Sequence, residues 1–201
     1  PFTDSRLYIP LGTSANYWYM STAEAFTESN AAVKTFQFFK TVHSATPVLW
    51  GNDGVNTIRS NTNPINGGAA WSAQTTVGTS YYSITALIQK SGALYIMKED
   101  MPYYLSAAGA VQNSLAPELA ALTSSTSGKN VKLWKNALYI PCGTQSLLET
   151  DGTTNTFISP ALFCTNLSDF NGQIQALAYD DMYLFAGLDN STKIEILAGR
   201  E

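Results

Sequence analysis

One short apolar phrase recurs along the chain at nearly even intervals. Three copies read Leu-Tyr-Ile, one reads Leu-Trp and the last reads Met-Tyr-Leu. The copies stand at residues 7–9, 49–50, 94–96, 138–140 and 182–184, so that the steps between them are 42, 45, 44 and 44 residues. A fixed period of about 40 to 45 residues is typical of repeat folds, in which each repeat is one small structural unit.

Each copy of the phrase has alternating runs on both sides. An upstream run is visible at 84–92, 131–136 and 174–181, and a downstream run at 17–20, 56–60, 103–106, 146–150 and 193–197. A weaker fourth run follows in places, as at 156–162. Tyr, Ile, Val and Trp at a period of two indicate β-strands. Gly-Asn-Asp-Gly at 51–54 and Asp-Gly at 151–152 predict hairpin turns between them.

Four short strands in each repeat predict an all-β fold, a β-propeller built of four-stranded antiparallel blades at a 42–45-residue period. The recurring phrase is the most apolar strand, so it is expected near the middle of each blade, buried on both sides. Leu7, Leu94, Leu138 and Met182 are then expected at equivalent buried positions. A long β-sandwich also uses short strands, but it does not predict a phrase at a constant step.

The period predicts one propeller domain, or part of one, over residues 1–201. The approximate blades are 1–30 (partial), 31–80, 81–127, 128–170 and 171–201 (partial). The first unit is expected to begin at its second strand and the last to stop after its third, so the two ends duplicate each other. We therefore expect an incomplete ring whose end units are covered by further sequence or by a partner chain, because open strand edges and apolar faces are costly.

Composition excludes several classes of function. Hydrophobic residues make up 45% of the chain, charged residues only 13%, and the net charge is −4 with Lys and Arg scattered singly. No nucleic-acid partner is expected from such a pattern. No stretch reaches 18 apolar residues, so no membrane insertion is expected. Cys142 and Cys164 are expected as unbonded buried thiols and, with one histidine, they cannot form a zinc site; no metal or cofactor is predicted.

Candidate catalytic groups are few and each has a structural explanation. His43 is the only histidine, and no Gly-x-Ser-x-Gly elbow accompanies it. The remaining candidates are carboxylates in expected turns or at strand ends, namely Asp53, Asp151, Asp189, Glu99-Asp100 and Asp180-Asp181. Some propellers are glycosidases that use two such acids, but here that hypothesis rests on the fold alone. No catalytic residue is predicted.

Surface aromatics raise the alternative of a carbohydrate-binding propeller. The candidates are Trp18, Tyr81-Tyr82 and Tyr103-Tyr104. Adjacent aromatics on a strand point to opposite sides, so one of each pair is expected in the core. Two glycosylation sequons, at Asn166 and Asn190, are expected by chance in a chain so rich in Asn, Ser and Thr.

The repeat phrases themselves resemble a known family. The matching residues of one repeat are Trp71, Val77-Gly78, Ile84-Thr85, Leu94-Tyr95, Lys98-Glu99-Asp100 and Pro117-Glu118-Leu119. Those of the next are Trp134, Leu138-Tyr139, Pro141, Gly143 and Asp151-Gly152. Together they resemble repeat proteins of tailed bacteriophages, although Met101-Pro102 replaces the usual small turn.

The resemblance implies a virion-associated structural or tail protein without assigned catalytic residues. Its partners would be other virion proteins or further copies of itself, with host-surface glycans as a further option. The sequence therefore predicts a non-enzymatic structural or binding protein, a rigid interaction scaffold in the phage particle. A propeller lectin and a propeller glycoside hydrolase are the alternatives.

Overall fold

Antiparallel strands make up almost all of the regular structure in the computed structural model. The structure describes residues 2–3, 5–12, 16–29, 36–43, 46–65, 71–105, 111–112, 116–117, 119, 123–143, 146–158, 172–189 and 194–200. Within these ranges the strands form five sheets that follow one another along the chain, four with four strands and one with three. The all-β fold class predicted from the sequence is confirmed.

The sheets are simple meanders in which consecutive strands pair. The first holds β1 (Phe2–Thr3), β2 (Arg6–Pro10), β3 (Tyr17–Met20) and β4 (Phe26–Glu28). The second holds β5 (Phe39–Val42), β6 (Val48–Asn52), β7 (Thr57–Asn61) and β8 (Thr75–Thr76). The third holds β9 (Ile84–Lys90), β10 (Ala93–Lys98), β11 (Pro102–Leu105) and β12 (Val111–Gln112). The fourth holds β13 (Lys132–Trp134), β14 (Ala137–Cys142), β15 (Ser146–Thr150) and β16 (Asn155–Ile158), and the fifth β17 (Gln173–Tyr179), β18 (Tyr183–Asp189) and β19 (Ile194–Arg200).

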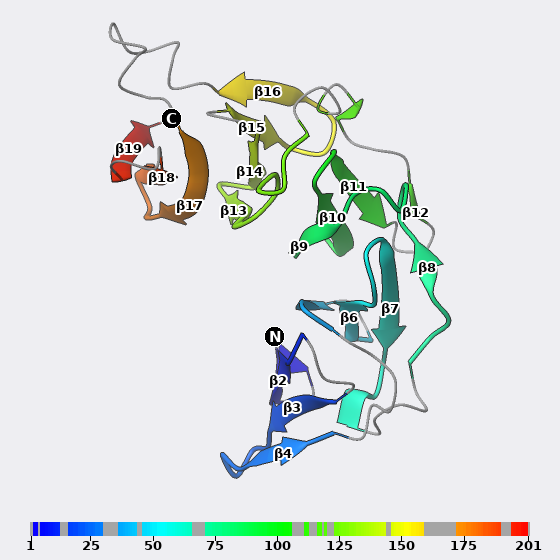
Figure 1. Cartoon of the computed structure of the whole chain (residues 1–201). Helices are drawn as coiled ribbons and strands as arrows, with labels where there is room; N and C mark the ends of the chain where they lie inside the picture. The colour runs from blue at the N-terminus through cyan, green and yellow to red at the C-terminus, as the bar shows by residue number, and fades with distance from the viewer. Residues whose placement is uncertain are drawn as a thin grey trace, which may run out of the picture.

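The five sheets are arranged along an arc that is open between the first and the last (Figure 1). The first strands lie on the inner side of the arc, where β5 contacts β9, β9 contacts β13 and β13 contacts β17. The last strands, such as β4, β8 and β16, lie on the outer side (Figure 1). The starts of the inner strands therefore gather residues that are far apart in the sequence.

Apolar cores lie between successive sheets. Tyr8 and Tyr17 of the first sheet pack with Leu49 of the second, and Ile58 of the second packs with Ile96 of the third. The same holds for the later pairs: Met97 of the third sheet joins Ile140 of the fourth, and Tyr139 of the fourth joins Leu184 of the fifth. Each inner sheet is thus apolar on both faces, and neighbouring sheets stabilise one another by burying those faces.

The recurring phrase occupies the same register in the first, third and fourth sheets. Leu7, Leu94 and Leu138 all lie one residue pair beyond the hairpin that joins the first two strands. Met182 does not; it lies in that hairpin and is 48% exposed, so the prediction for it is wrong. Leu184 takes the equivalent position, because the phrase is offset by two residues from the hairpin in the last sheet.

Two further sequence expectations need correction. The first unit does not begin at its second strand, because β1 pairs with β2; a two-residue strand is too short to show an alternating pattern. Tyr81 and Tyr82 lie in the turn before β9 rather than on a strand, so neither is directed into the core by strand alternation. The Asp-Gly hairpin signals are confirmed: Gly54 and Gly152 both have φ of +100° in turns between strands.

Candidate functional site

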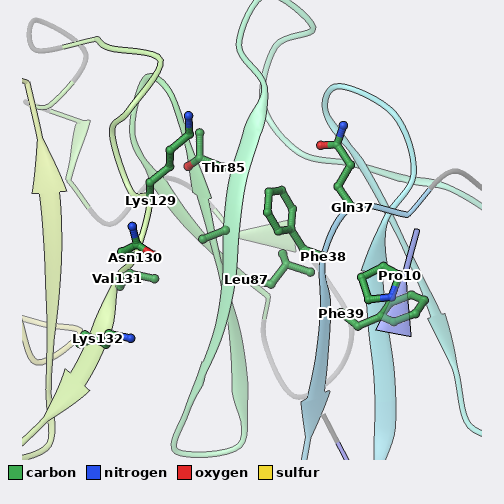
Figure 2. Close-up of a pocket in the computed structure, with 11 residues that line it drawn as sticks. Pro10, Gln37, Phe38, Phe39, Thr85, Leu87, Lys129, Asn130, Val131 and Lys132 are labelled. Carbon is green, nitrogen blue, oxygen red and sulfur yellow. The ribbon is translucent and has the colours of Figure 1, made fainter. Parts of the chain in front are cut away.

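A pocket opens on the inner side of the arc, lined by segments of the first four sheets (Figure 2). Its volume is about 560 Å³. One wall is formed by residues 37–39, which lead into β5, together with Pro10 at the end of β2. Residues 85–87 of β9 form the middle, and residues 129–132, which lead into β13, form the opposite wall. The pocket exists because the inner strands of separate repeats begin side by side.

Buried polar groups hold both walls of the pocket in place. The side-chain oxygen of Asn52, a buried residue, accepts hydrogen bonds from the backbone N–H groups of Gln37 and Phe38 at 2.9 and 2.8 Å. The Thr85 hydroxyl donates to the carbonyl of Ser127 at 2.7 Å. Gly128 has φ of +75°, and a Cβ there would lie 2.4 Å from Cβ of Met97, so the opposite wall requires glycine at this position. The pocket is therefore preformed.

The pocket combines an apolar surface with cations. Phe38, Leu87 and Val131 supply apolar area, while Lys129 is exposed and Lys132 is half-buried. Its described lining contains no Asp or Glu, although acidic residues outnumber basic ones in the chain. Sequence reasoning missed this pocket. The available signal was that the inner strands β5, β9 and β13 each carry a lysine and no carboxylate.

The structure does not bring the predicted carboxylates together. Asp53 lies in the turn between β6 and β7, Asp151 in the turn between β15 and β16, and Asp189 at the end of β18. Asp151 accepts hydrogen bonds from the backbone and hydroxyl of Thr153 and from the backbone of Thr154, which hold its pKa down to about 2. The Asp180 carboxylate likewise accepts two backbone N–H groups at the hairpin before β18. These acids stabilise turns, as expected.

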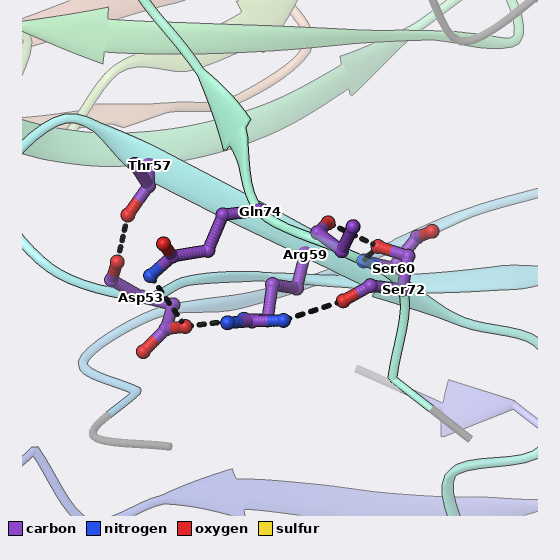
Figure 3. A network of polar contacts seen from close by, with 7 residues as sticks. Asp53, Thr57, Arg59, Ser60, Ser72 and Gln74 are labelled. Atoms are coloured by element: carbon purple, nitrogen blue, oxygen red, sulfur yellow. Dashed lines mark hydrogen bonds and ion pairs between the residues drawn. The ribbon is translucent and has the colours of Figure 1, made fainter. Parts of the chain in front are cut away.

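Asp53 belongs to a network that fastens the outer part of the second sheet (Figure 3). Its carboxylate forms an ion pair with Arg59 and accepts a hydrogen bond from Gln74 at 3.1 Å. Arg59 also donates to the carbonyl of Ser72 at 2.7 Å, and the Thr57 hydroxyl donates to the Asp53 carbonyl. The network joins the β6–β7 turn to the segment before β8, so its role is structural.

A second buried polar cluster lies in the third sheet. Lys98 is 1% exposed and donates to the carbonyls of Val77 and Thr79 at 2.8 and 2.6 Å. Burial lowers the pKa of Lys98, and Asp100 partly opposes that effect. The Tyr103 hydroxyl donates to Asp100 at 3.1 Å, and burial together with Asp100 raises the pKa of Tyr103 to about 12. Lys98, Asp100 and Tyr103 are all buried, and Lys98 supplies the hydrogen bonds that two carbonyl groups of the connection before β9 require.

The remaining candidates are scattered over the molecule. His43 is exposed after β5, and Tyr81 is 86% exposed in the turn before β9. Tyr103 is buried in the core between the second and third sheets, and Tyr104 is half-buried against the core between the third and fourth, so both members of this pair pack between sheets rather than one. Cys142 is a free thiol whose pKa burial raises to about 12. Cys164 and both sequons, Asn166 and Asn190, lie outside the described residues.

The described residues contain neither a cluster of metal ligands nor a membrane-spanning helix. No three His, Cys, Asp or Glu side chains gather there as metal ligands. No helix in the described ranges has the length and apolarity that a membrane-spanning helix needs.

The first sheet presents an apolar face on the side away from the second sheet. Tyr8, Tyr17 and Tyr19 face the second sheet. Because side chains alternate along a strand, their neighbours point to the other side. This first end face carries Leu7, Ile9, Trp18, Met20 and Phe26, the last of which is 55% exposed.

The last sheet presents a similar face at the other end of the arc. Leu184, Ala186 and Leu188 of β18 face the fourth sheet. The opposite side, the last end face, carries Ala176, Ala178, Tyr183, Phe185, Ile196 and Ala198. Ile196 is 75% exposed, and the rings of Tyr183 and Phe185 lie 6.1 Å apart. Both end faces are therefore composed like the faces that are buried between the inner sheets.

Comparison with solved structures identifies the class of fold. The chain is similar to virginiamycin B lyase from Staphylococcus aureus, with a TM-score of 0.67 and 12% identity over 97% of this chain and 67% of the lyase. A streptogramin B lyase gives 0.62 and 11% over 99% and 66%. The computationally designed Ika4 protein gives 0.50 and 14% over 80% and 91%. No protein-family model and no curated protein sequence matches the chain.

These neighbours show that the fold is propeller-like. The chain spans about two thirds of the length of the two lyases. At 11–14% identity the likeness concerns the fold alone, so the lyase activity is a property of those proteins.

Proposed function

We propose that this chain is a non-enzymatic interaction scaffold, a stretch of β-propeller whose four-stranded blades repeat at steps of 42 to 46 residues. The observation that carries this proposal is the pair of apolar end faces, on which Phe26 and Ile196 are 55% and 75% exposed. Faces of the same composition are buried between every pair of neighbouring sheets. Exposed apolar patches of this kind mark protein interfaces.

The partner that we propose is another copy of the same chain. The first end face of one copy would pack against the last end face of the next, in the way that adjacent sheets pack within the chain. Such a contact joins two different surfaces, so it is head-to-tail and generates a ring or a filament. The setting that we propose is the particle of a tailed bacteriophage, supported by the resemblance of the repeat phrases.

Light scattering coupled to size exclusion tests the proposed contact. Trp18→Glu places a charge on the first end face, and Phe185→Glu places one on the last. We expect the unsubstituted protein to associate as its concentration rises, and each variant to be monomeric while it keeps its β-sheet circular dichroism. Tyr81→Glu, an exposed position away from both faces, is the matched control and should associate normally.

Mixing the two variants gives the sharper result. The Trp18 variant keeps an intact last end face and the Phe185 variant an intact first end face, so the mixture should form one heterodimer and no larger species. A monomeric unsubstituted protein at all concentrations, or two variants that associate as well as the control, would contradict the proposal.

A further inference from the structure

The inner pocket is a second, independent binding feature of this chain. We propose that it binds a small molecule that has an apolar body and one anionic group. This site is separate from the end faces, and it does not depend on association of the chain.

The apolar body is inferred from the middle of the pocket. Phe38, Leu87 and Val131 come from three different sheets and line one continuous cavity (Figure 2). Ligand sites are concave and mostly apolar, with a few polar groups that set orientation. A volume of about 560 Å³ lies within the range of such sites, so the cavity accommodates a group of one or two rings.

The anionic group is inferred from the charges at the pocket. Lys129 and Lys132 stand on the same wall, three residues apart, and neither has an ion pair among the described residues. Asn130 stands between them, its side-chain amide bonded to the carbonyl of Gln175. Because the described lining holds no carboxylate, a cationic ligand would find no opposite charge there, whereas an anion would find an ammonium group towards either end of this wall (Figure 2).

The surrounding strands carry the same charge. Lys40 lies on β5 and Lys90 on β9, and the inner strands β5, β9, β13 and β17 contain no Asp or Glu. Lys90 is engaged elsewhere, since its ammonium donates to the carbonyl of Asp151 at 2.5 Å. The inner strands next to the pocket, β5, β9 and β13, thus each carry a lysine and no carboxylate in a chain whose net charge is −4. This contrast selects anionic ligands over neutral ones of the same shape.

A matched pair of ligands tests the proposal by calorimetry and by backbone-amide NMR. The probes are 2-naphthoate and its neutral amide, 2-naphthamide, which have the same apolar body. We expect naphthoate to bind about three- to tenfold more tightly at low salt, since each exposed ion pair contributes little, and salt should reduce this advantage. Shift changes should centre on the amides of residues 85–87 and 129–132.

Three variants identify the groups responsible. Lys129→Gln with Lys132→Gln should abolish the preference for naphthoate, because it weakens the affinity for naphthoate more than that for naphthamide. Lys135→Gln, which removes a lysine from a hairpin outside the pocket, should keep the preference. Leu87→Ala should weaken both probes. Absence of binding, equal binding of the two probes by the unsubstituted protein, or shift changes confined to the end faces would overturn the proposal.

Discussion

The central sheets and the end sheets use the same phrase with different results. In the third and fourth sheets, Leu94, Ile96, Leu138 and Ile140 are at most 2% exposed. In the first sheet, Leu7 and Ile9 are only half-buried, although their sequence and register are the same. The difference is the number of neighbours, since a central sheet has one on each face and an end sheet has one. Burial is therefore a property of position in the arc.

The two Asp-Gly turns also differ, because their surroundings bury one aspartate and leave the other exposed. Asp53 is 7% exposed and its carboxylate forms an ion pair, whereas Asp151 is exposed and its carboxylate bonds only within its own turn. Both precede a glycine with φ of +100°. The same local motif thus places its carboxylate in a buried network in one sheet and in an exposed turn in another.

The largest effect should come from truncating the recurring leucine. Leu138→Ala removes a side chain that is fully buried between two sheets, so we expect a loss of about 2–5 kcal/mol in the free energy of unfolding. Leu7→Ala should cost about 1 kcal/mol, because one face of its sheet is open. Urea unfolding in the Trp18→Glu background measures both without association. Equal losses would show that the end sheet is covered in solution.

A smaller loss in the free energy of unfolding should follow when the Asp53–Arg59 ion pair of the second sheet is broken. Asp53→Ala leaves the Arg59 guanidinium without its carboxylate in a partly buried place, so we expect a loss of about 1–3 kcal/mol. The Asp53→Ala/Arg59→Ala double variant should lose less than the sum of the two single variants, by about 0.5–3 kcal/mol. Additive losses would show that the two residues act separately.

The smallest effect should be the acid response of the Asp151 turn. The pKa of Asp151 is lowered from 3.8 to about 2, so its contribution to stability is present above pH 3.8 and is lost as the pH falls towards 2. Thr153→Val removes a hydroxyl donor and should raise this pKa. Thr154→Val is the control, because Thr154 donates through its backbone. Carboxyl NMR titration distinguishes them, and equal pKa values in both variants would contradict the assignment.

Most of the strands were predictable from local pattern. The expected runs at 17–20 and 146–150 coincide with β3 and β15, because alternation of large and polar residues is read directly from the sequence. The fifth repeat was misaligned at Met182, because a two-residue change in hairpin position leaves the apolar pattern almost unchanged. The pocket was not predictable, since its walls come from residues 37–39, 85–87 and 129–132, which no local pattern connects.

Local sequence predicts most of the β-strands, their turns and the shared register of Leu7, Leu94 and Leu138. These features depend on side-chain alternation and on turn residues within one repeat. Which copies of the phrase are buried, and where the lysines meet an apolar pocket, follow only from the tertiary structure. These depend on contacts between repeats, and the free energy of such contacts is set by neighbours that lie about 40 residues or more away in the chain.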